Sequence, residues 1–309
     1  MPTELKKVSS VSLGDGIVHS KNLSGIGFVD DFLILAADEG NTVQILRESG
    51  SGYELVLNHP LNEDGKEIDI ESVAVEGRTV YLLGSHAMVR KKLKDDDTVA
   101  ENRLALRDPN KVKSDPHRDV IFRVELNGSG TPEDQVATSL HDILKGDPTL
   151  SRFTNIPSKE NGVDLEGLAV RDGVMFIGFR GPVLRDNWTP VMVCAFAKQI
   201  HDYELRYINL NGHGVRDIDT VEGGFLILSG PNGTGPGEYF IWFWDGGDML
   251  PGVREGESIG VLKLLANVPA DGEKPEGMAV IEETATGYEF LLVCDGAVNG
   301  RATRYTVGK

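Results

Sequence analysis

Five copies of one short pattern, spread along the chain, constrain its fold more than any other feature. The pattern is a polar, usually acidic, residue, a small residue, alternating apolar positions, a Gly- or Asp-rich turn and a strongly apolar run. The copies occupy residues 23–38, 70–86, 165–180, 215–230 and 275–295. Each copy is typical of a β-hairpin, two short strands around a turn such as Asp172-Gly173. The sequence therefore predicts a repeat protein built from antiparallel hairpins.

Further strand-like runs follow the hairpins. They lie at residues 42–46, 53–57, 120–124, 203–208, 239–244 and 259–264. Four short strands per repeat are typical of a β-propeller, in which four-stranded blades surround a central channel. A length of 309 residues would by itself allow two domains. The repeats instead favour an all-β fold with a single β-propeller domain over residues 1–309.

The spacing of the copies bears on the number of blades. Equivalent positions are 47, 95, 50 and 60 residues apart, and the longest interval has room for a sixth blade. No copy of the pattern occurs between residues 87 and 160, however, and the charged segment at about 87–118 is predicted to be an insertion within blade two. Five blades are therefore favoured, with six as the alternative. An N-terminal strand at 8–13 is expected to close the ring, because an open ring would leave an exposed edge.

Charge and composition bear on the binding partners and on the cellular location of the protein. Lys and Arg number 31 against 48 Asp and Glu, a net charge of −17, which argues against nucleic acid or an anionic membrane and permits metal cations. No apolar run is long enough to span a membrane. Cys194 and Cys294 lie in apolar runs typical of buried thiols. The first residues contain no apolar signal-peptide segment, so a cytoplasmic location is expected, or a periplasmic one if a leader was removed.

The repeats bring polar residues to one level of the channel. The innermost strand of each blade lines the channel, so the equivalent positions Ser24, Glu71, Glu166, Arg216 and Glu276 should converge on its axis. The ends of the adjacent antiparallel strands should face the same mouth. These ends carry Asp38, His86, Arg180 and Asp295. Asp69 and Asp164, two residues before a glutamate, are expected to stabilise turns, with support of the neighbouring ligands as the alternative.

The predicted mouth has more carboxylates than arginines. Two carboxylates ~4 Å apart repel by about 4 kcal/mol at an effective dielectric near 20. Pairing with the arginines, a raised carboxyl pKa or a bound cation would each relieve this repulsion. Oxygen ligands suit Ca²⁺, with Mg²⁺ or Mn²⁺ as alternatives, and a single histidine makes zinc less suitable. The expected metal ligands are Glu71, Glu166, Glu276, Asp38 and Asp295. The alternative is salt-bridged packing without a metal.

Two functions fit this charge pattern. The first is a divalent-cation-dependent hydrolase of an ester, lactone or phosphoester, in which His86 or a carboxyl with a raised pKa moves protons. Arg180 and Arg216 are the other expected catalytic residues, which would hold an anionic small-molecule substrate or stabilise the charge that develops on it. The second is a non-catalytic propeller that binds a ligand or a protein, with a structural polar channel. No nucleotide cofactor is expected, because the Gly-rich connector at 230–237 does not match a phosphate-binding loop.

Several phrases resemble a bacterial family, domain of unknown function 3616 (DUF3616). They are found at residues 83–86, 163–170, 178–185, 214–218, 226–231 and 274–277. The resemblance implies a propeller without an assigned activity. The Glu-Gly-apolar-Ala phrase at Glu166 and Glu276 is also similar to that of the esterase-like phytases. It is similar as well to that of the calcium-dependent gluconolactonases and paraoxonases, in which the glutamate of a Glu-Gly pair is a metal ligand.

Overall fold

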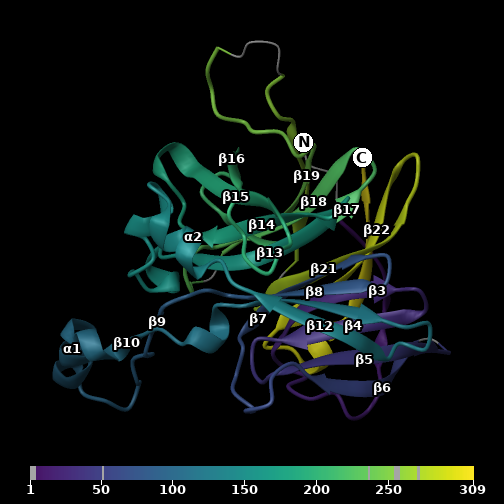
Figure 1. The fold of residues 1–309 in the computed structure, drawn as a ribbon, viewed down its shortest axis with the longest axis horizontal. Coiled ribbons are helices and arrows are strands. Elements are labelled where there is room, and N and C mark those ends of the chain that lie inside the picture. The colour runs from purple at the N-terminus through teal and green to yellow at the C-terminus, as the bar shows by residue number, and fades with distance from the viewer. Residues whose placement is uncertain (1–4, 51, 236, 254–257, 270–271) are drawn as a thin grey trace.

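The computed structural model describes residues 5–50, 52–235, 237–253, 258–269 and 272–309. Five antiparallel sheets form the five blades of a β-propeller (Figure 1). The all-β prediction is thereby confirmed, with five blades rather than six. No helix in the described ranges is long and apolar enough to cross a membrane.

The blades follow one another along the chain, each with its innermost strand first. Blade one contains β3 (Leu23–Val29), β4 (Phe32–Ala37), β5 (Thr42–Ser49) and β6 (Gly52–Pro60). Blade two contains β7 (Ile70–Glu76), β8 (Thr79–Gly84), β11 (Ile121–Leu126) and β12 (Pro132–Thr138). Blade three contains β13 (Asp164–Arg171), β14 (Val174–Gly181), β15 (Trp188–Ala195) and β16 (Glu204–Asn209). Blade four contains β17 (Gly214–Val221), β18 (Gly224–Gly230), β19 (Tyr239–Trp244) and β20 (Leu262–Val268). Blade five contains β21 (Lys274–Glu283), β22 (Gly287–Asp295), β23 (Thr303–Gly308) and β1 (Lys6–Ser10).

The apolar runs of the repeats are the second strands of the blades. Every residue of β4 and of β18 is buried, because both faces of a blade are covered by its neighbours. The outer strand β12 instead has mostly exposed or half-buried residues. Five hydrophobic clusters make up the core, and each lies between two adjacent blades. Cys194 and Cys294 are buried free thiols, as their apolar surroundings predicted.

The N-terminal strand pairs with the last blade, but not over the residues expected. Strand β1 runs from Lys6 to Ser10 and pairs with β23, whereas the expected strand was 8–13. Ser12 and Leu13 form a separate strand, β2 (Ser12–Leu13), which pairs in parallel with β6 of blade one. The chain leaves blade five at this point because the Leu13 side chain is buried in the cluster between blades one and five.

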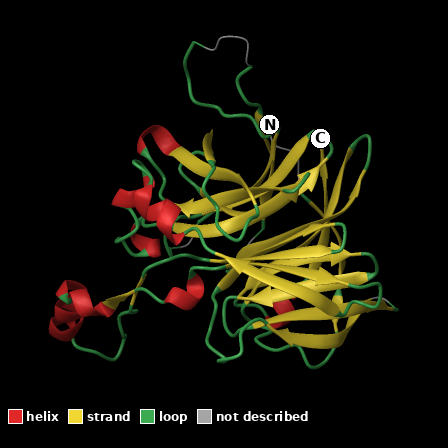
Figure 2. Ribbon diagram, viewed as in Figure 1, coloured by secondary structure: helices red, strands yellow, loops and turns green. Residues whose placement is uncertain are grey.

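The charged segment leaves blade two between its second and third strands. Between β8 and β11 it forms β9 (Val89–Arg90), α1 (Val99–Arg107), η1 (Pro109–Lys111), β10 (Val112–Lys113) and η2 (Pro116–Arg118). Its α1 end extends away from the blades (Figure 1). The remaining helical turns are α2 (His141–Gly146), η3 (Leu150–Arg152), η4 (Ser158–Glu160), η5 (Arg185–Asn187) and η6 (Val298–Arg301). They are short segments in the connections between strands (Figure 2).

Candidate functional site at one mouth of the channel

A β-bulge occurs near the start of every innermost strand. In β13, Leu165 pairs with Phe179 and Gly167 pairs with Gly178, so that Glu166 has no partner residue on β14. The same skip occurs in β3, β7, β17 and β21. The bulged residues are Ser24, Glu71, Glu166, Arg216 and Glu276. A bulge changes the direction in which its side chain points relative to the regular alternation of the strand. The same bulge in all five blades therefore directs five polar side chains in the same way.

Contacts between these side chains connect neighbouring blades around the mouth. The Ser24 hydroxyl of blade one donates a hydrogen bond to the Ile70 carbonyl of blade two. Arg216 Nη1 in blade four donates to Glu166 Oε2 in blade three at 2.8 Å and to Glu276 Oε1 in blade five at 3.0 Å. The bulged residues of blades three, four and five therefore form one ion-pair network.

Arg180 belongs to the same network, from the end of β14. Its Nη1 lies 2.5 Å from Glu166 Oε1, and its Nη2 donates to the Asp164 carboxylate. Both arginines are nearly inaccessible to solvent. The Nε atoms of Arg180 and Arg216 are buried without a hydrogen-bond partner in the described structure. Arg180 uses both outer nitrogens for carboxylates, whereas Arg216 binds its two carboxylates through Nη1 and donates from Nη2 to the Pro231 carbonyl at 3.2 Å. Each arginine retains one N–H group, at Nε, that a water molecule or a ligand oxygen can satisfy.

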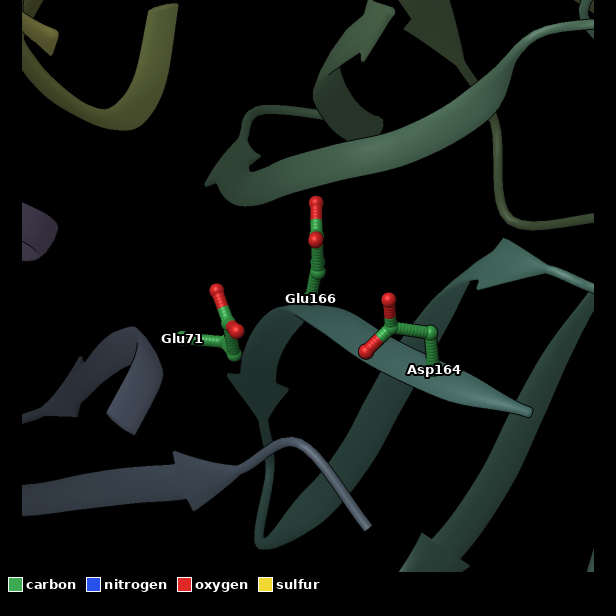
Figure 3. Close-up of side chains that lie close together, drawn as sticks. All are labelled: Glu71, Asp164 and Glu166. Carbon is green, nitrogen blue, oxygen red and sulfur yellow. The ribbon is translucent and has the colours of Figure 1, made fainter. Parts of the chain in front are cut away.

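Three carboxylates lie close enough to share a cation. Carboxylate oxygens of Glu71, Asp164 and Glu166 are all within 4.8 Å of one another. Figure 3 shows that Asp164 and Glu166 come from one strand and Glu71 from a neighbouring blade. Glu71 is partly exposed, and among the described residues its carboxylate makes no hydrogen bond or ion pair. Glu71 is therefore the acid of this group that the arginines leave unpaired.

Burial and mutual repulsion set the protonation of these acids. Glu71, Asp164, Glu166 and Glu276 face only two guanidinium groups, which leaves two surplus negative charges. Burial raises the pKa of Asp164 to about 7, against the opposing effect of Arg180. Burial likewise raises the pKa of Glu276 to about 8, although Arg216 lowers it. Burial, followed by the charge of Glu166, raises the pKa of Glu71 well above its usual range.

Two of the expected ligands, Asp38 and Asp295, lie on the rim outside the three-carboxylate group. Asp295 ends β22 and pairs with the Lys274 ammonium. Asp38 follows β4, and burial together with the charge of Asp295 raises its pKa to about 7. Glu276 also lies outside the group, bound by Arg216. Of the expected metal ligands, the structure brings together Glu71 and Glu166 and adds Asp164 as the third carboxylate.

His86 is committed to the backbone. Its Nδ1 lies 2.8 Å from the Gly84 carbonyl, and its Nε2 accepts a hydrogen bond from the Leu140 amide at 3.1 Å. The ring is therefore neutral, with the proton on Nδ1, and burial lowers its pKa. Neither nitrogen is available for acid–base chemistry. The histidine instead fastens the residue that precedes α2 to blade two.

A second buried acid crosses the channel one residue further along the innermost strands. Asp217 Oδ1 accepts hydrogen bonds from Ser72 Oγ at 2.7 Å and from the Ile218 amide at 2.9 Å, and Oδ2 accepts one from the Met278 amide at 2.7 Å. Asp217 thereby joins blades two, four and five. Sequence analysis assigned it no role. The available signal was that the equivalent residues are small, namely Gly25, Ser72, Gly167 and Gly277.

The Gly-rich connector after β18 contacts the mouth. Asn232 Nδ2 donates to the Arg180 carbonyl and to Asn161 Oδ1, both at 2.9 Å. Asn161 in turn binds the backbone of Val183. Residue 236 of this connector lies outside the described residues. The connector and the segment around Asn161 thus hold the strand end that carries Arg180.

Comparison with known proteins identifies the family of this chain. The sequence profile of the family described as "Protein of unknown function (DUF3616)" matches residues 22–307. The chain belongs to the DUF3616 family. Among curated proteins, no sequence matches. The match covers all five innermost strands and therefore every bulged residue at the mouth.

Two solved structures are among those similar to this DUF3616 protein. The PQQ-bound aldose sugar dehydrogenase of Streptomyces coelicolor is 12% identical with a TM-score of 0.46, over 100% of this chain and 99% of that chain. The WD40 β-propeller domain of Doa1 is also 12% identical, with a TM-score of 0.35, over 96% of this chain and 71% of that chain. Because both TM-scores are below 0.5 and both identities are low, nothing is inferred about this chain from these two similarities.

Proposed function

We propose that the channel mouth binds a divalent cation through Glu71, Asp164 and Glu166, and that the protein is a cation-dependent hydrolase of an ester, lactone or phosphoester. The observation that carries the proposal is the Glu71 carboxylate, which lies within 4.8 Å of two other acids and has no partner of its own among the described residues. A divalent cation would balance the surplus negative charge of the network. Oxygen-only ligands favour Ca²⁺, with Mg²⁺ and Mn²⁺ as alternatives.

The bound cation would polarise a carbonyl or phosphoryl oxygen of the substrate. Glu276 then replaces His86 as the proton carrier that we propose, because its pKa of about 8 keeps it protonated near neutral pH. Its Oε1 accepts from Arg216, which orients the carboxyl. The unpartnered Nε groups of Arg180 and Arg216 are donors that can stabilise negative charge on a substrate oxygen.

The competing function is a non-catalytic propeller that binds a small molecule or a protein. The pairing of each arginine with two carboxylates favours it, because such pairs consume the groups that would hold an anionic substrate. Under this alternative the network would serve only to join the blades. Turnover that depends on the bound cation separates the two functions.

The test is thermal unfolding of the protein after metal depletion, followed by addition of Ca²⁺, Mg²⁺ or Mn²⁺. A cation that binds only the native state should stabilise it by about 2.7 kcal/mol at 100-fold its Kd. We expect Glu71→Gln to abolish this increase. The control is Glu282→Gln, which changes an exposed acid on the same type of strand at the opposite mouth.

Two results would contradict the cation site: no stabilisation of the wild type by any of the cations, or an equal increase in Glu71→Gln and wild type. The hydrolase assignment has its own test. Ester, lactone and phosphoester substrates are assayed with and without the stabilising cation, and turnover should require both the cation and Glu276. Cation binding without turnover of any substrate would support the non-catalytic alternative.

A further inference from the structure

The insertion of blade two has the opposite charge from the rest of the chain. Residues 87–118 contain nine Lys and Arg against six Asp and Glu, in a protein whose net charge is −17. Some of the positive charge fastens the insertion to the blades. Arg118 pairs with Glu67 and Asp69, and Arg90 pairs with Glu160. These contacts account for Arg90 and Arg118 but not for the lysines.

A two-stranded ribbon separates the two kinds of basic residue. Strands β9 and β10 are antiparallel, with Arg90 opposite Val112, and the Lys91 amide donates to the Lys111 carbonyl at 2.8 Å. Successive residues of a strand point to opposite faces. Arg90 is thus on the face that reaches Glu160, whereas Lys91 and Lys111 are on the other face.

Three lysines gather on that second face without acidic partners. Lys91 directly follows β9 and Lys111 directly precedes β10, and both line the same cavity as Lys113. Within the described structure, Lys91, Lys111 and Lys113 make no ion pair. Lys91 is directly opposite Lys111, and like charges in that position destabilise a pair of strands. An anion placed between them would remove this repulsion.

The lysines line a cavity of about 340 Å³. Ser114 and Arg118 also line it, and Val89 provides an apolar wall. Asp115 is the one acid among the cavity's described lining residues, and its Oδ1 is engaged by the His117 amide and lies 2.9 Å from His117 Nδ1. The cavity therefore presents an excess of ammonium groups together with a hydroxyl. Its volume is in the range of small-molecule sites.

We propose that this cavity binds the phosphoryl group of a small phosphorylated molecule. Lysine ammonium groups act as mobile point charges toward phosphate oxygens, and the Ser114 hydroxyl can donate to one of them. The apolar surface of Val89 is available to the carbon skeleton of the ligand. The site does not depend on the cation proposed for the channel mouth, since its lining residues belong to the insertion.

Titration calorimetry with inorganic pyrophosphate as the probe tests the proposal, in metal-depleted buffer at constant low ionic strength. The wild type should show saturable binding, and the double variant Lys111→Gln/Lys113→Gln should bind at least about tenfold more weakly, as expected from losing two charge-assisted contacts. The matched control is Lys198→Gln/Lys263→Gln, which removes the same charge from exposed lysines outside the cavity. The control should bind pyrophosphate like the wild type.

Three results would overturn the proposal. They are no saturable binding to the wild type, equal weakening in the two double variants, or binding of citrate as tight as that of pyrophosphate, which would show selection for charge alone. Lys113 is exposed and Lys111 is half-buried, so we expect the double variant to fold, and thermal unfolding of each variant verifies this. If a phosphorylated sugar displaces pyrophosphate from the protein and the unphosphorylated sugar does not, the result extends to small phosphorylated molecules.

Discussion

The channel mouth and the insertion both gather like charges, but they treat them differently. At the mouth, Glu166 and Glu276 are buried and bound by arginines from other strands. On the insertion, Lys91 and Lys113 are exposed and meet no acid among the described residues. A buried charge must be compensated within the protein, whereas water can solvate an exposed one. The charges of the mouth therefore stabilise the fold through their pairing, whereas those of the insertion remain open to solvent and to a ligand.

Removing a cation from the mouth should have the largest effect. Arg216→Met would leave Glu276 buried without its partner and Glu166 with one guanidinium instead of two. Breaking a buried ion pair in this way typically costs about 3–5 kcal/mol of unfolding free energy. Urea unfolding of the variant near pH 8 measures the loss. Arg185→Met is the control, since that side chain is 94% exposed, and it should change stability by less than about 0.5 kcal/mol.

A loss below about 1 kcal/mol in Arg216→Met would contradict this account of the mouth. It would mean that the acids take up protons and are therefore not buried as unpaired charges. The dependence of stability on pH measures that proton uptake directly.

Replacing Glu71 should reveal proton uptake at the mouth. Its pKa is raised in the folded protein, so between the unfolded carboxyl value of about 4 and the folded value the native state binds more protons than the unfolded state. Stability contributed by this group therefore falls as pH rises through that window. Glu71→Gln should become more stable relative to the wild type from about pH 5 to pH 8, by at most about 1.4 kcal/mol per pH unit.

Denaturant unfolding of metal-depleted wild type and Glu71→Gln across this range gives the difference. Glu282→Gln, at the opposite mouth, should run parallel to the wild type at every pH. If the difference in stability between Glu71→Gln and the wild type did not change with pH, ionisation of Glu71 would not destabilise the folded protein. The mouth would then need no cation to compensate its charge.

Neutralising a lysine of the insertion should have the smallest effect. Lys111→Gln removes the repulsion with Lys91 and breaks no ion pair among the described residues. In phosphate-free buffer we expect the free energy of unfolding, measured by thermal unfolding, to increase by no more than about 0.5 kcal/mol. A clear loss of stability would show that the lysine has a structural partner, and the contrast with Arg216 would then disappear.

The repeats made much of the architecture predictable. A polar residue at the start of each apolar hairpin marked the five innermost strands, and the missing copy between residues 87 and 160 marked the insertion. The five marked positions proved to be the five bulges, because a repeated local pattern produces a repeated local conformation. The bounds of the ring-closing strand were wrong by a few residues, since burial of Leu13 ended it early.

Partners within the site were not predictable in the same way. His86 was expected to move protons, but its Nε2 is occupied by the amide of Leu140, 54 residues away. Asp164 was expected to stabilise a turn, and it instead faces Glu71 of the preceding blade. Arg180 and Arg216 were expected to hold an anionic ligand, and both are bound to acids.

The sequence by itself determined the class of fold, the number of blades and the level at which polar side chains meet. These properties follow from hydrophobic periodicity and from the repeat, which are local along the chain. Only the tertiary structure decided which acid faces which arginine, that Glu71 remains unpaired, and that three lysines share one face of a ribbon. Such pairings depend on side-chain distances between segments far apart in sequence. For a buried acid, a displacement of a few ångströms relative to an arginine decides whether it forms an ion pair or has a raised pKa.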